Sequence, residues 1–140
     1  MKNLIRVIAT LFILGGLISF VSVAAMANDK KETKLEQLYT DGVTHFKQGD
    51  FTKAITYFID YTRRNKVKQA NFAYLYLSES YKELGDYKKA VLYSNYVLDN
   101  SPTMEEKALS YNLLSQIYFI TDDNTNSSKY YKLYLAVSNY

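Results

Sequence analysis

The 140-residue sequence contains no cysteine, and it has only one histidine, one proline and five glycines. Without cysteine, the chain has no disulfide framework and no N-terminal cysteine to carry a lipid. The single histidine, His45, leaves no Cys/His set that would bind a transition metal. These absences exclude a disulfide framework, lipid attachment through an N-terminal cysteine and a metal site built from cysteine and histidine.

Catalytic motifs are absent as well. The sequence has no G-x-S-x-G, G-x-G-x-x-G or phosphate-binding loop. Residues 122–126 have the Asp-x-Asn-x-Asn pattern that opens a calcium loop, but Ser127 stands at the glycine position and Leu133 at the position of the bidentate glutamate. We interpret this segment as a polar turn. We therefore expect no catalytic residue, no metal and no cofactor.

The N-terminal segment has the parts of a secretory signal peptide. Lys2 and Arg6 precede an uncharged run over residues 7–27, which ends in a small-x-small cleavage pattern before a charged linker at residues 28–34. A paired glycine and a tail of small residues favour cleavage. Because the run is also long enough to span a bilayer of about 30 Å, an uncleaved inner-membrane anchor is the alternative. We expect an exported protein, periplasmic or secreted.

The charge balance changes when this segment is removed. Loss of residues 1–27 takes two of the 17 basic residues, which leaves 15 against 14 acidic residues and a net charge of +1. A nearly neutral domain is a poor nucleic-acid binder. The remaining 113 residues are enough for one small domain with a hydrophobic core.

The centre of the chain contains a motif of regularly spaced aromatic and small residues. Residues 74–81 read Tyr-x-x-Leu-Ser-x-x-Tyr, residues 85–90 read Gly-Asp-Tyr-x-x-Ala, and proline follows at position 102. This motif resembles one tetratricopeptide repeat, a helix hairpin of about 34 residues. The resemblance implies an all-α fold that binds other proteins and carries no reaction chemistry.

Two further units resemble the central one. Residues 42–58 repeat its turn and second helix, with Gly49 placed 36 residues before Gly85, and residues 111–118 repeat its first helix 37 residues later. We predict three hairpins stacked as a short right-handed α-solenoid over residues 35–140, with units at about 35–68, 69–102 and 103–140. The pattern is broken where His45 replaces tyrosine, where Ser94 replaces an aromatic residue, and in the 122–128 turn, which lacks glycine.

Local signals favour the same fold. Small residues recur where two helices must approach closely, at positions 42, 78 and 115 on the first helices and at 54 and 90 on the second. Gly-Asp at 49–50 and 85–86 is expected to end one helix and cap the next. Thr-Met-Glu-Glu at 103–106 is a capping box. His45 occupies an aromatic slot, so we interpret it as a packing residue and not as a base or metal ligand.

The concave side of such a stack is lined by first-helix residues that avoid the small packing positions. This groove suits an extended peptide or a partner helix, although several of its aromatic residues also suit a core role. The family's lysine and asparagine clamp for C-terminal carboxylates is absent, so we do not expect recognition of that kind. The predicted groove consists of Tyr39, Val43, Lys47, Phe72, Leu75, Glu79, Lys82, Asn112, Gln116 and Phe119.

Two other surfaces are candidates for association. Basic residues gather between units one and two, where they form either a solvated connection or a contact for an anionic partner or lipid surface: Arg63, Arg64, Lys66 and Lys68. The last helix has no polar capping helix after it, and its apolar arc is wider than one packed neighbour requires. We expect a homo-oligomer or a partner to cover this arc, at Tyr130, Tyr131, Tyr134 and Leu135.

The sequence thus predicts an exported adaptor or scaffold that binds another protein or peptide and acts in cell-envelope assembly or secretion. The alternative is a structural subunit that associates with itself through the tyrosine-rich C-terminal helix. The sequence alone does not distinguish this adaptor from an accessory domain that regulates an enzyme in trans.

Cleavage after Ala27 should give a product that begins at Asn28 and lacks the uncharged run. Intact-mass spectrometry of the protein from its native host measures this directly. A membrane-embedded species that still begins at Met1 would instead establish the anchor.

Overall fold

The computed structural model describes residues 33–65, 70–100 and 102–138. The chain divides into two units, residues 1–36 and 37–140, and of the first unit only residues 33–36 are described, as part of a helix. The predicted signal segment, most of the linker, Lys66 and Lys68 therefore lie outside the described residues. No helix in the described ranges is long and apolar enough to cross a membrane.

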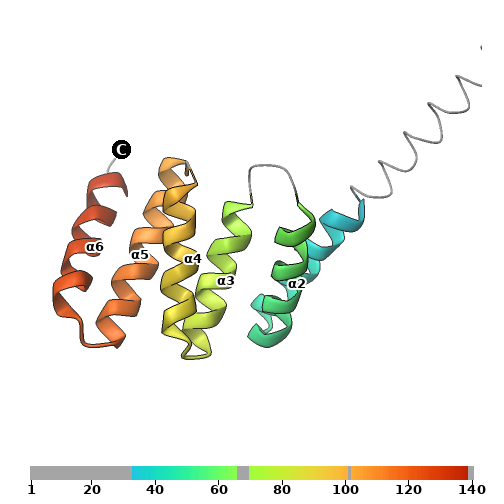
Figure 1. The fold of residues 1–140 in the computed structure, drawn as a ribbon, viewed down its shortest axis with the longest axis horizontal. Helices are drawn as coiled ribbons and strands as arrows, with labels where there is room; N and C mark the ends of the chain where they lie inside the picture. Colours follow the sequence, from blue (N-terminus) through green and yellow to red (C-terminus); the bar gives the residue numbers. More distant parts are fainter. Residues whose placement is uncertain (1–32, 66–69, 101, 139–140) are drawn as a thin grey trace, which may run out of the picture. The chain divides into compact units, whose positions relative to one another are not determined.

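The second unit is built from helices alone in its described residues. Its first helix runs to residue 47 and is followed by α2 (Phe51–Arg64), α3 (Asn71–Glu83), α4 (Tyr87–Asp99), α5 (Met104–Ile120) and α6 (Asn124–Ser138). Each labelled helix packs against the next in the chain, and α3 also contacts α5 (Figure 1). The predicted all-α fold of stacked helix hairpins is confirmed.

Glycine forms the turn inside the first two hairpins. Gly49 and Gly85 have φ angles of 76° and 79°, in the left-handed region that suits glycine. The next residue, Asp50 or Asp86, then caps the following helix, because its carboxylate accepts a hydrogen bond from the backbone N–H three residues on. The predicted glycine-aspartate turns are confirmed.

The third hairpin makes the same turn without glycine. Asp122 takes the left-handed position with φ 59°, and aspartate is among the few residues that tolerate it. Its backbone N–H donates to the carbonyl of Phe119 at 3.2 Å, the bond that Gly85 makes to Lys82 at 3.0 Å. The Asp123 carboxylate then accepts from the Asn126 N–H at 3.1 Å. The segment that resembles half a calcium loop is a helix-capping turn.

A capping box joins the start of α5 to the start of α3. The Thr103 hydroxyl accepts from the Glu106 N–H at 3.2 Å, and the Glu106 carboxylate accepts from the Thr103 N–H at 2.8 Å, as predicted. The same carboxylate also accepts from the Asn71 side chain at 3.0 Å. Both side chains are buried, so this link holds the second and third hairpins in one arrangement.

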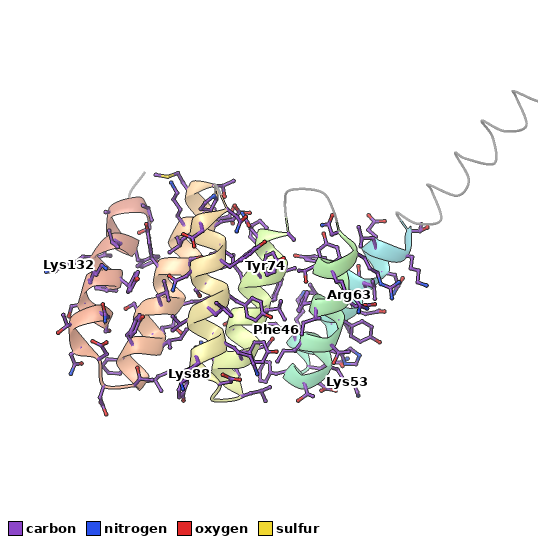
Figure 2. The ribbon with its side chains drawn as sticks, viewed as in Figure 1. Phe46, Lys53, Arg63, Tyr74, Lys88 and Lys132 are labelled. Carbon is purple, nitrogen blue, oxygen red and sulfur yellow. The ribbon has the colours of Figure 1, made fainter. Side chains whose placement is uncertain are left out.

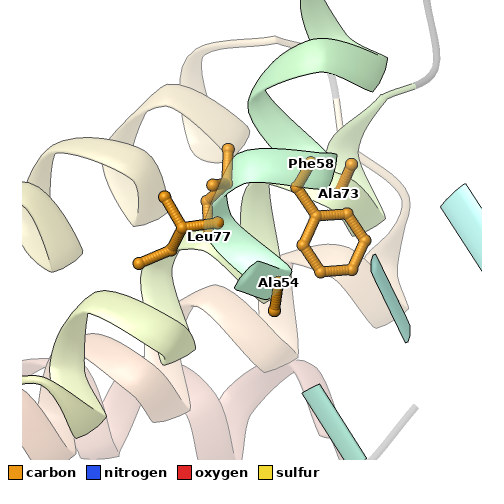
Figure 3. Close-up of a cluster of buried hydrophobic side chains, with 5 residues drawn as sticks. Ala54, Phe58, Ala73 and Leu77 are labelled. Atoms are coloured by element: carbon orange, nitrogen blue, oxygen red, sulfur yellow. The ribbon is translucent and has the colours of Figure 1, made fainter. Parts of the chain in front are cut away.

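The core between the first and second hairpins centres on one aromatic residue. Phe58 is fully buried with Ala54, Ala73 and Leu77 (Figure 3). It lies against Gly42, where a Cβ atom would stand 2.8 Å from the Phe58 ring. Glycine at position 42 therefore makes room for the phenyl ring.

In the second hairpin, two serines lie at the close contact between the helices. The Ser78 hydroxyl donates to the backbone carbonyl of Ala90 at 2.8 Å and lies 2.7 Å from the Ser94 hydroxyl, which donates to it. All three residues are fully buried. Ser94 stands where the first hairpin has Phe58, so a serine pair replaces a glycine and phenylalanine pair. In the third hairpin, the Ser127 hydroxyl donates to the Ser115 carbonyl at 3.1 Å.

Each hairpin also contains one stacked aromatic pair at the same register. Its two residues are 12 positions apart in the sequence, one on the first helix and one on the second. The rings are nearly parallel, with interplanar angles of 11°, 8° and 4°, and such pairs add stability beyond area burial. The pairs are His45 with Tyr57, Tyr81 with Tyr93, and Tyr118 with Tyr130.

Replacement of Ala90 by leucine should lower the free energy of unfolding by about 1–3 kcal/mol, because the Cβ position is fully buried at the contact with Ser78. Lys88→Leu on the exposed side of α4 is the matched control, since it adds a leucine to the same helix without overpacking (Figure 2). Chemical denaturation measures both. Equal stability of the two variants would contradict this packing.

Candidate functional site

A cavity of about 260 Å³ lies between α3 and α5. These are the first helices of the second and third hairpins, the face on which the sequence places a groove. The structure brings five of the predicted groove residues together here and adds three that were not predicted. The predicted residues are Phe72, Leu75, Glu79, Asn112 and Gln116, and the added ones are Tyr76, Leu109 and Leu113.

One half of the cavity is apolar, with an open rim and a closed floor. Phe72 and Leu109 stand at the rim, where 40% and 39% of their surface is exposed. Leu75 and Leu113 form the floor and pack with the fully buried Val97 of α4. A floor supported from behind keeps its shape, so the cavity exists before a ligand arrives.

The other half is polar and its hydrogen bonds are only partly satisfied. Lys82 donates to the Gln116 side-chain carbonyl at 3.0 Å, and Gln116 donates to the Asn112 side-chain carbonyl at 3.2 Å. Lys82 also pairs with Glu83 at 3.2 Å. Within the described parts of the chain, the Glu79 carboxylate has no hydrogen-bond or ion-pair partner.

Tyr76 connects the cavity to the core. Its ring stacks on Phe58 with a centroid distance of 5.0 Å and an angle of 2°, and it also contacts Phe46 at 5.0 Å. It lines the cavity as well. Helical spacing alone did not assign Tyr76 to the groove, because it lies between the groove face and the core face of α3.

The remaining predicted groove residues do not line this cavity. Tyr39 and Val43 pack against the core around Phe58, and Tyr39 is also in ring contact with Tyr61 and Tyr76. Lys47 is exposed, Phe119 is 68% exposed, and neither lines the cavity. Tyr39 and Val43 thus have the core-packing role that was the alternative to groove lining.

The basic cluster is partly neutralised within its own helix. Arg63 and Arg64 both form ion pairs with Asp60 on α2. Hydrogen bonds from Arg63 and then Arg64 lower the pKa of the Asp60 carboxyl group. These two guanidinium groups are therefore weaker anion attractors than the sequence suggested.

A second cavity of about 370 Å³ opens on the other side of the stack, between α2 and α4. Burial, and then a hydrogen bond with Tyr96, raises the pKa of the Tyr74 hydroxyl there to about 12. Figure 2 labels Tyr74 on α3 and Arg63 on the adjacent α2. The lining residues are Ile59, Thr62, Arg63, Tyr74, Leu92, Tyr93 and Tyr96.

The C-terminal helix α6 has no buried residue among those described. Tyr130 packs on α5 through its stack with Tyr118, so it belongs to the third hairpin's own interior. Tyr131 and Leu135 are 51% and 40% exposed, and Tyr134 lies beside Tyr131 with a centroid distance of 6.2 Å. Two of the four predicted association residues, Tyr131 and Leu135, are thus exposed, and Tyr134 is half-buried beside Tyr131.

His45 packs as the sequence analysis interpreted it. Its ring stacks on Tyr57 at 5.3 Å, and its Nδ1 atom lies 3.7 Å from the Asp50 carboxylate. No group of three or more metal-ligating side chains occurs in the ranges that the structure describes.

Comparison with known families identifies the third hairpin. Residues 108–139 match the family model of the tetratricopeptide repeat. The match covers most of α5 and α6, the hairpin whose turn lacks glycine. No curated protein matches the chain. Repeats of this family are interaction modules that bind other proteins.

Proposed function

We propose that this tetratricopeptide repeat protein is an exported adaptor or scaffold that binds a segment of a partner protein in its concave groove. The cavity between α3 and α5 is the observation that carries the proposal. Its apolar rim is exposed, its floor is supported by the core, and its polar end retains hydrogen-bonding capacity. These are the features of a preformed binding site.

The rim supports a peptide-like ligand because of its arrangement. Phe72 of α3 and Leu109 of α5 stand on opposite sides of the opening and leave apolar area in water. A partner side chain inserted between them would remove that area from water. The cavity therefore suits a protein segment with one large apolar side chain better than it suits a flat protein surface.

Export supports a role in the cell envelope. Residues 1–27 have the pattern of a signal peptide, and cleavage would release the interaction domain on the far side of the inner membrane. If the segment is retained as an anchor, the same domain would act at the membrane surface. Assembly of envelope components or secretion is the setting in which an exported adaptor without catalytic motifs would act.

Simultaneous Phe72→Ser and Leu109→Ser changes should weaken partner binding about tenfold or more, because both rim anchors are lost. Helicity should persist, since both side chains are well exposed. Leu75 is a poor choice for this test because it is 6% exposed and belongs to the core. Cross-linking followed by affinity capture from envelope extract and quantitative mass spectrometry measures recovery of the partner.

The matched control is Leu84→Ser with Leu92→Ser, which removes two exposed leucines outside this cavity. The control should recover the partner as the parent does. If the control loses the partner and the rim variant keeps it, binding occurs around Leu84 or Leu92 and not in this cavity; Leu92 lines the second cavity.

Self-association is the second candidate, and the exposed side of α6 favours it. Tyr131→Lys should dissociate a dimer formed through this helix, since it places a charge among Tyr131, Tyr134 and Leu135. Sedimentation over a concentration series compares the variant with the parent. A parent protein that stays monomeric at high concentration excludes this candidate.

A further inference from the structure

We propose that the cavity selects an extended partner segment in which a large apolar side chain and a lysine or arginine lie two residues apart. The proposal rests on the function proposed above and specifies its ligand. Its basis is the Glu79 carboxylate, which has no partner among the described residues and lies in the same cavity as Phe72, Leu75 and Leu109.

The charge on the polar half of the cavity is the first argument. Glu79 has no partner within the described residues, although Lys82 follows it by three positions on the same helix. Lys82 is instead held by Glu83 and Gln116. Glu79 is the charged residue among the described residues that line the cavity, so its carboxylate gives this end a charge of −1. A concave protein wall strengthens the field of such a charge, so a cationic ligand group is favoured.

The side-chain amides are the second argument. The oxygens of Asn112 and Gln116 already accept hydrogen bonds from within the protein. The Asn112 side-chain nitrogen makes no hydrogen bond in the parts of the chain that the structure describes. It is therefore a donor for a ligand carbonyl. An extended segment presents free backbone carbonyls, whereas a helix uses its own internally.

The spacing of the two halves is the third argument. Leu75 on the apolar floor and Glu79 are one turn apart on α3, a rise of about 6 Å for four residues. In an extended chain, side chains two residues apart lie on one face and are separated by about 6.6 Å. An apolar side chain above Leu75 thus places the second side chain beside Glu79.

Selection from a displayed library of random octapeptides, with the full chain as bait, tests the inference. The parent should enrich peptides with a large apolar residue two positions from lysine or arginine. Glu79→Lys should shift the enrichment at that second position to aspartate or glutamate. Asp99→Lys is the matched control, because it makes the same charge change at an exposed residue at the end of α4, and it should leave the parent preference intact.

The affinity of each variant for a synthetic consensus peptide measures how much Glu79 contributes to binding. Glu79→Lys should weaken binding roughly five- to tenfold and Glu79→Gln about threefold, in line with the strength of a partly exposed ion pair. The Asp99→Lys value should equal that of the parent. Added salt should reduce the difference between the parent and Glu79→Gln.

Two results would overturn the inference, and they differ in what they leave standing. Enriched peptides that lack a basic residue, yet are lost with Phe72→Ser and Leu109→Ser, would reject the ligand chemistry and retain the groove as the binding site. Enrichment that survives this rim variant, or no enrichment by the parent, would reject the proposed function together with the inference.

Discussion

The fold depends on the close approach of the two helices within each hairpin. At the closest point one partner is a small residue, and the three hairpins meet the requirement in different ways. Gly42 admits the ring of Phe58, Ser78 bonds to the backbone of Ala90, and Ser127 bonds to the backbone of Ser115. Ser78 and Ser127 thus serve both as small spacers and as hydrogen-bonded links between the two helices of a hairpin.

This close packing is what creates the candidate site. α3 and α5 are the first helices of the second and third hairpins, and they contact each other directly. The space between them is floored by Leu75 and Leu113, which rest on Val97 of the intervening α4. The second helix of one hairpin therefore supports a ligand site formed by the first helices of two.

Much of this was predictable because it depends on neighbours in the chain. The glycine-aspartate turns and the capping box at residues 103–106 involve hydrogen bonds over three to five positions, so residue types alone identify them. Helical spacing placed on one face five residues that the structure brings to one cavity, because such spacing holds wherever a helix is regular. Asp122 shows the limit of such rules, since its left-handed conformation supplies the turn without the expected glycine.

The all-α class, the hairpin repeat and the caps at Asp50, Asp86 and Thr103 could be predicted from the sequence, because helical periodicity and local hydrogen bonding set them. Which of the predicted groove residues remain open depends on how the helices pack. Helix packing places Tyr39 in the core and Leu75 on the cavity floor, and it brings Tyr76 and Leu109 to the cavity. Among the described residues it leaves Glu79 without an ion-pair partner, while Lys82 pairs with Glu83. These outcomes depend on contacts between different helices, such as Tyr39 with Phe58, Leu75 with Leu113 and Lys82 with Gln116, and no local pattern specifies the distances between them.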